Sequence, residues 1–169
     1  MSRDANPPAP PTPSQTVGPF FGFALPFDGD SDSTHGSSGA RLRVEGQLTD
    51  GAGAPVPDGL IEIFDGEQFA RCRTDTEGVF HFTVLTPRAH EGLAPHFDVM
   101  VFARGLLRQL WTRMYLPGPG SIPPSDPVLE LVDADRRERL VARDVAGVLR
   151  FDLRLQGEGE SVFFALPDF

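Results

Sequence analysis

The chain has 169 residues, of which 15 are Lys or Arg and 24 are Asp or Glu, so its formal net charge is −9. This acidic balance argues against a protein that binds nucleic acid or an anionic membrane through a basic face, and we expect neither among its partners. The single cysteine, Cys72, excludes an internal disulfide and a zinc site built from several cysteines. No apolar segment approaches the roughly 18 residues of a membrane span, and the start of the chain has no secretory signal pattern, so we expect a cytoplasmic protein.

The first 40 residues predict an N-terminal arm followed by a loop. Residues 1–13 are rich in proline and should be extended, and residues 28–40 are rich in Gly, Ser and Asp, which favours a flexible loop. Between them, prolines and glycines predict an irregular path, although Phe20, Phe21 and Phe23 call for burial.

From residue 41 onward, apolar and polar residues alternate with a period of two, which is typical of half-buried strands. In the strand expected over 97–102, for example, Phe97, Val99 and Val101 share one face. Further strands are expected over 41–48, 60–64, 79–84, 110–116, 148–155 and 162–165.

These elements predict an all-β fold, an antiparallel β-sandwich of about seven to eight strands with an extended N-terminal arm. We expect one domain over residues 1–169, with the sandwich formed by residues 41–169. One short peripheral helix is expected over 133–142, where Asp133/Arg137 and Asp135/Arg139 have i,i+4 spacing.

Few residues have the spacing of a familiar catalytic or metal site. His96 and Asp98 stand two apart on one expected strand and so share a face, but two ligands do not complete a metal site. A hydrogen-bonded His/Asp pair is the simpler interpretation. Tyr115 is the only tyrosine, so a mechanism that requires two tyrosinate ligands cannot be housed in this chain alone.

Four segments together resemble the intradiol ring-cleavage dioxygenases. They are Thr-Pro-Ser-Gln-Thr-Val-Gly-Pro-Phe at 12–20, Ala-Pro-His-Phe-Asp-Val-Met-Val-Phe-Ala-Arg-Gly at 94–105, Thr-Arg-Met-Tyr-Leu at 112–116 and the run from Arg150 to Phe164 that contains Gln-Gly-Glu-Gly-Glu. The resemblance covers both ends and the middle of the chain. Within this family, the four segments most resemble the alpha type of chain.

This resemblance implies a hetero-oligomer of two homologous β-sandwich chains that cleaves a carboxylated catechol with O2. In the family, the beta chain holds Fe(III) through two tyrosines and two histidines. Here the corresponding His-x-His is His96-Phe97-Asp98, and Phe69 stands where a ligand tyrosine is expected. We therefore expect no metal in this chain and expect the iron to be held by a partner beta subunit.

The resemblance also implies that Thr16, Gly18, Pro19 and Arg104 line the substrate cleft. A guanidinium suits an anionic aromatic substrate because it stays charged and forms forked hydrogen bonds. An arginine followed by Gly105 at a strand end can project from a tight turn.

The chain departs from the family around 65–71 and 86–94, where its loops are shorter. Contacts that the family makes through those loops cannot be transferred to this sequence. The alternative hypothesis is a non-enzymatic β-sandwich that serves as a binding module.

Overall fold

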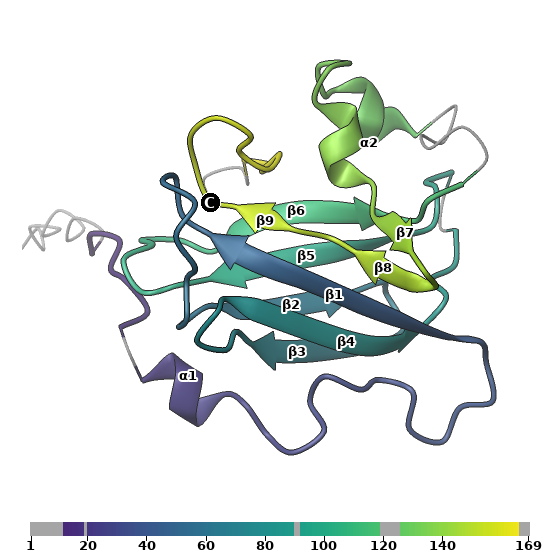
Figure 1. The fold of residues 1–169 in the computed structure, drawn as a ribbon, viewed down its shortest axis with the longest axis horizontal. Coiled ribbons are helices and arrows are strands. Elements are labelled where there is room, and N and C mark those ends of the chain that lie inside the picture. The colour runs from purple at the N-terminus through teal and green to yellow at the C-terminus, as the bar shows by residue number, and fades with distance from the viewer. Residues whose placement is uncertain (1–11, 19, 90–91, 119–125, 166–169) are drawn as a thin grey trace, which may run out of the picture.

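The computed structural model describes residues 12–18, 20–89, 92–118 and 126–165, which form two β-sheets stacked face to face (Figure 1). The first sheet has the order β4 (Val79–Leu85), β1 (Arg41–Thr49), β8 (Val148–Arg150) and β7 (Arg143–Val145), with β9 (Leu153–Arg154) also paired to β1. The second has the order β3 (Phe69–Arg73), β2 (Leu60–Phe64), β5 (His96–Phe102) and β6 (Leu110–Tyr115). The predicted all-β sandwich is thus confirmed.

The core lies between the two sheets and follows the alternation of the sequence. On β5, Phe97, Val99 and Val101 are buried, whereas Asp98 and Met100 on the opposite face are partly exposed. The other strands add side chains with the same period: Val44, Leu48, Ile61, Ile63, Ala70, Cys72, Phe80, Phe82, Val84 and Met114. Burial of these apolar side chains is the main favourable term in folding.

The first sheet is mixed, although the sequence predicted an antiparallel one. Both β8 and β9 run parallel to β1, and the predicted strand 148–155 is split between them. At the break, the Phe151 amide donates to the Glu45 carbonyl (2.8 Å). The backbone approaches so closely there that a Cβ on Gly46 would lie 2.0 Å from the Phe151 carbonyl oxygen, so only glycine fits.

Two strands were not expected from the sequence. In β3, Ala70 and Cys72 point to the core while Arg71 and Arg73 point away, so the strand has too few apolar residues to stand out. Its turn from β2 is stabilised by Asp65, whose Oδ1 accepts from the amides of Glu67 (3.0 Å) and Gln68 (2.8 Å). The other, β7, has three exposed residues.

The predicted helix over 133–142 was only partly right. The structure has an α-helical turn, α2 (Pro127–Glu130), and a 3-10 turn, η1 (Arg137–Leu140). The expected i,i+4 pairs do not form, because Arg137 Nε donates to the Val132 carbonyl (2.8 Å) and Arg139 Nη1 to the Glu160 carbonyl (2.8 Å). Both turns contribute to a second apolar cluster, formed by Tyr115, Leu129, Val132, Leu140 and Val162.

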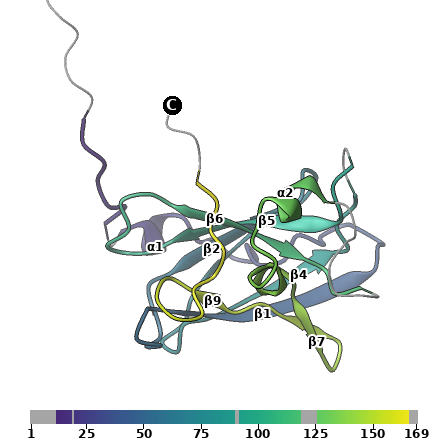
Figure 2. The same ribbon diagram turned by 90° about the horizontal axis from the view of Figure 1, so that it is seen from above.

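The segment after the arm contains one helical turn, α1 (Phe21–Ala24), on the side of the molecule opposite α2 (Figures 1 and 2). Two arginines of β3 hold it: Arg71 Nη1 donates to the Leu25 carbonyl (2.9 Å) and Arg73 Nη1 to the Gly22 carbonyl (3.3 Å). Phe21 is buried, but Phe20 and Phe23 are 77% and 72% exposed, contrary to the expectation that all three are buried. In the described segments, no helix has the length and apolar character needed to cross a membrane.

Candidate functional site

The described part of the arm turns at Gly18. This residue has φ of +70°, a left-handed conformation that glycine adopts without strain, and its amide donates to Thr16 Oγ1 (3.3 Å). Thr16 itself is exposed. Pro19, the third arm residue expected at the cleft, lies outside the described residues.

Arg104 occupies the turn that follows β5, as its position before Gly105 suggested. The turn is closed by a hydrogen bond from the Leu106 amide to the Ala103 carbonyl (3.1 Å), and Gly105 has φ of +95°. The Arg104 side chain is 63% exposed, and its Nε lies 2.8 Å from Asp58 Oδ2.

The arm and the β5–β6 turn lie at the same end of the sandwich (Figures 1 and 2). Among the described residues, the Gly18 amide donates to Thr16 Oγ1, but no hydrogen bond or ion pair joins Arg104 to either of them. The structure therefore places the segments that carry Thr16, Gly18 and Arg104 at one end of the molecule.

A charged cluster occupies the outer face of the second sheet, where the sequence placed the His96/Asp98 pair. The two side chains do share a face, and His96 Nε2 lies 3.7 Å from Asp98 Oδ1. Arg113 lies nearer: the register places it opposite Asp98 on β6, and its Nε donates to Asp98 Oδ1 (3.0 Å). Trp111 Nε1 donates to the same oxygen (3.3 Å).

Sequence reasoning missed Arg113, although one signal was present. It is a charged residue in a strand whose neighbours are mostly apolar, and its side chain is only 9% exposed. A buried guanidinium requires an anionic partner, and that requirement could have directed the search to a carboxylate on an adjacent strand.

Tyr115 completes the buried part of this cluster. Its hydroxyl accepts from Arg113 Nη1 (3.5 Å), and its ring centre is 5.4 Å from that of His96. Burial, with the negative charge of Asp126 as a smaller contribution, raises the pKa of Tyr115 to about 12. Burial alone would lower the pKa of Arg113, but the Tyr115 hydroxyl and the Asp98 charge outweigh it and raise that pKa. Tyr115 is therefore neutral and Arg113 charged at physiological pH.

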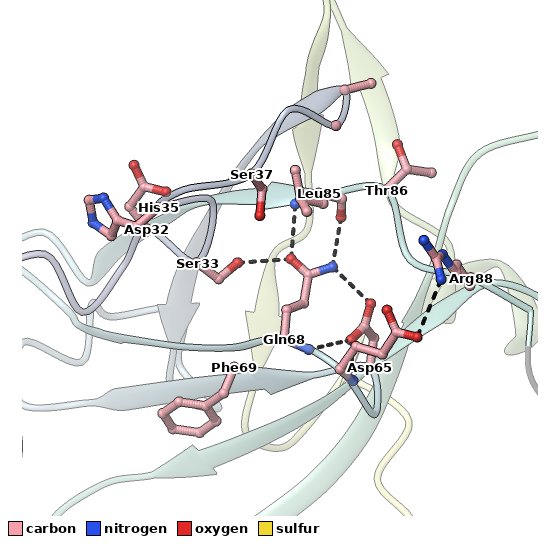
Figure 3. A pocket seen from close by; sticks show the side chains of 13 residues that line it. Asp32, Ser33, His35, Ser37, Asp65, Gln68, Phe69, Leu85, Thr86 and Arg88 are labelled. Atoms are coloured by element: carbon pink, nitrogen blue, oxygen red, sulfur yellow. Dashed lines mark hydrogen bonds and ion pairs between the residues drawn. The ribbon is translucent and has the colours of Figure 1, made fainter.

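A separate cavity of about 590 Å3 lies where the edges of the two sheets meet, and Gln68 stands at its centre (Figure 3). Gln68 Oε1 accepts from the Leu85 amide (2.9 Å) and from Ser33 Oγ (2.8 Å). Its Nε2 donates to the Leu85 carbonyl (3.0 Å) and to Asp65 Oδ2 (2.8 Å). The amide thus joins the start of β3 to the end of β4, to the loop that contains Ser33 and to the β2–β3 turn, which indicates a structural role.

Cys72, the lone thiol, is buried between the sheets. Burial raises its pKa, so the thiol is protonated and unreactive at neutral pH despite its two arginine neighbours.

Comparison with known proteins identifies the family. The chain is 35% identical to the protocatechuate 3,4-dioxygenase alpha chain of Burkholderia cepacia over an alignment of 190 residues, which covers 90% of this chain and 96% of that protein. The chain belongs to the protocatechuate 3,4-dioxygenase alpha-chain family.

The chain is less similar in sequence to the protocatechuate 3,4-dioxygenase beta chain of Burkholderia cepacia. It is 26% identical over 133 residues, which cover 62% of this chain and 56% of the beta chain. Among solved structures, the dioxygenase domain of a carbohydrate-binding fusion from Streptomyces sp. SirexAA-E superimposes with a TM-score of 0.55 at 24% identity, covering 88% of this chain and 99% of that domain. This likeness supports the fold. No protein-family model matches the chain.

The resemblance of this alpha-family chain to intradiol dioxygenases implies ferric iron, but the residues around Asp98 do not fit that ion. The Arg113 guanidinium already contacts both Asp98 Oδ1 and the Tyr115 hydroxyl, so a permanent positive charge lies between these oxygen atoms. Across the described ranges, no three His, Cys, Asp or Glu side chains form a group that could hold a metal.

The pKa of Tyr115 predicts a loss of stability in alkali. Because the phenol has a pKa of about 12 when folded and about 10 when unfolded, the unfolded chain loses this proton first as the pH rises. The stabilisation is complete below the unfolded pKa and is lost as the pH rises toward the folded one. Between about pH 9 and about pH 11, we expect the unfolding free energy of Tyr115→Phe to fall by about 1.3 kcal/mol less than that of the unmodified chain.

Urea denaturation at the two pH values measures this difference. Cys72, whose pKa is also raised, contributes equally in both proteins and cancels. The same alkaline fall in the unmodified chain and in Tyr115→Phe would contradict the assignment.

Proposed function

We propose that this chain is the non-iron-binding alpha subunit of a protocatechuate 3,4-dioxygenase. In this proposal the complex cleaves protocatechuate between its two hydroxyl-bearing carbons, and both atoms of O2 enter the product, 3-carboxy-cis,cis-muconate. The reaction belongs to the β-ketoadipate route of aromatic catabolism. The similarity to an alpha chain over nearly its whole length carries the proposal, since the similarity to the beta chain is lower and shorter.

The homologous beta subunit holds the ferric ion in this proposal. Support comes from the guanidinium of Arg113, which lies against Asp98 and Tyr115. Bringing a ferric ion into the same place would set two cations against each other at short range, in surroundings that screen charge poorly. The iron chemistry is therefore assigned to the partner, and this chain supplies groups that bind and orient the substrate.

Arg104 is the group that we assign to the anionic substrate. The chain has a net charge of −9, so its average field repels a carboxylated catechol, and a local cation is needed to reverse that field. The contact with Asp58 uses Nε, which leaves the two terminal nitrogens as donors for a carboxylate. Thr16, Gly18 and Pro19 are assigned to the same cleft, where they bring a thin backbone close to the ligand.

The segment after the arm supplies a surface for the beta subunit. Phe20, Phe23 and Phe27 are 77%, 72% and 61% exposed, and Val17 and Leu25 are 44% and 41% exposed. Exposed apolar side chains concentrated in one short segment are typical of protein–protein contact sites. Since the arm and Arg104 share one end of the molecule, docking through this segment would bring both to the beta subunit's active site.

Reconstitution with the homologous beta chain tests the proposed function. We expect this chain alone to show no oxygen uptake with protocatechuate, and the two chains co-expressed to form a complex that consumes protocatechuate and O2 in equal amounts. Size-exclusion chromatography and an oxygen electrode measure the two properties. A chain that stays separate from the beta chain would favour the binding-module alternative.

Replacing Arg104 tests the assigned substrate contact. In the reconstituted complex, Arg104→Ala should lower kcat/KM by about one to two orders of magnitude, because a charge-assisted hydrogen bond to the carboxylate is lost. The kcat/KM of Arg104→Lys should lie between those of the unmodified complex and Arg104→Ala, since lysine keeps the charge but loses the forked geometry. Arg88→Ala is the matched control: this arginine is 77% exposed and paired with Glu67 at 3.4 Å, away from the arm. Unchanged kinetics in Arg104→Ala would remove this residue from the site.

A further inference from the structure

A second, smaller cavity opens on the outer face of the second sheet, next to the charged cluster. It has a volume of about 180 Å3 and is lined by Phe64, Asp98, Met100, Gln109 and Trp111. The register places Phe64 opposite Asp98 and Met100 opposite Trp111, so three adjacent strands each supply part of the wall. Of the residues that the structure describes, Thr16, Gly18 and Arg104 do not line it.

Trp111, the aromatic wall of this cavity on β6, is held in place by its neighbours. Trp111 Nε1 donates to Asp98 Oδ1, and the indole packs against the ring of Phe164, with centres 5.2 Å apart. The Phe164 amide also donates to the Trp111 carbonyl (2.8 Å), and the Arg113 guanidinium lies 5.7 Å from the indole centre. A wall fixed in this way loses little freedom when a ring packs on it.

Asp98 gives the cavity one strong hydrogen-bond acceptor. Its Oδ1 accepts from Arg113 and Trp111, whereas no residue in the described part of the chain donates to Oδ2. The side chain is 33% exposed, so it can be reached by a ligand. Because the buried Arg113 balances its charge, the site favours an uncharged hydroxyl donor over an ammonium group or a carboxylate.

The size of the cavity restricts the ligand further. A protein cavity of about 150 Å3 lined by apolar side chains binds benzene, so about 180 Å3 admits one ring with a small substituent. We propose that this cavity binds a monocyclic phenol without a carboxylate, its ring against Phe64, Met100 and Trp111 and its hydroxyl donating to Asp98. This site goes beyond the proposed function, whose substrate is carboxylated and is met by a cation.

Trp111 is the only tryptophan of the chain, so its fluorescence reports on this cavity. Phenol titrated into the full-length chain should change the emission in a saturable way. Anisole, which lacks the hydroxyl proton, and 4-hydroxybenzoate, which adds a carboxylate, should each bind about tenfold more weakly. Asp98→Asn should weaken phenol binding about fivefold, because a charged acceptor is replaced by a neutral one.

Two phenylalanines provide a matched pair of variants. Phe64 and Phe69 are opposite each other in the register and 40% and 42% exposed, but of the two only Phe64 lines the cavity. Phe64→Ala should weaken phenol binding at least tenfold, whereas Phe69→Ala should leave it unchanged. Circular dichroism checks that each variant is folded, and the ligand series on the unmodified chain gives a result even if a variant is not.

Three results would overturn the proposal: equal affinity for phenol and anisole, equal effects of the two alanine substitutions, or no saturable change at all. A loss of phenol binding when the beta chain is added would also overturn it, since a partner side chain would then fill the cavity. The titration needs neither iron nor turnover, so its failure is distinct from failure of the proposed function.

Discussion

The ion pair between Asp98 and Arg113 is the interaction on which the outer face of the second sheet depends. A guanidinium that is nine-tenths buried cannot remain without an anion, and the register of β5 and β6 supplies that anion directly opposite. Once the pair is formed, Asp98 also fixes the indole of Trp111, and Arg113 contacts the hydroxyl of Tyr115. This one pair thus sets the charge of the region and fixes the position of the indole.

This constraint determines which chemistry the chain can support by itself. A carboxylate, an imidazole and a phenol lie close together on the sheet, and the Arg113 side chain carries the positive charge among them. A metal ion in this region would lie close to that fixed positive charge, which disfavours its binding. In the proposed complex, this chain contacts the substrate and its partner carries the redox chemistry.

The features that the sequence predicted well are those that depend on local patterns. Alternation of apolar and polar residues identified β1, β2, β4, β5 and β6 and the correct buried face of β5. The Arg-Gly pair after β5 correctly predicted an exposed arginine in a tight turn, although its role at a cleft stays a prediction.

The features that were missed depend on contacts between distant segments. Arg113 pairs with a residue 15 positions earlier in the chain, so no local pattern reveals it. The parallel pairing of β8 and β9 with β1 depends on a close approach of the backbone at Gly46. In the region of the helix expected over 133–142, Arg137 and Arg139 donate to the backbone carbonyls of Val132 and Glu160 and do not form the expected i,i+4 pairs. The exposure of Phe20 and Phe23 could not be predicted either, because the apolar character of a phenylalanine indicates burial without showing whether its own chain or another protein covers it.

The location of the iron in a crystal of the two-chain complex tests the central claim most directly. An anomalous difference map recorded at the iron absorption edge shows each iron atom independently of activity. The account predicts one strong peak in each beta subunit and none near Asp98 of this chain, with the Arg113 guanidinium in place. An iron peak bound by His96 or Asp98 would contradict it.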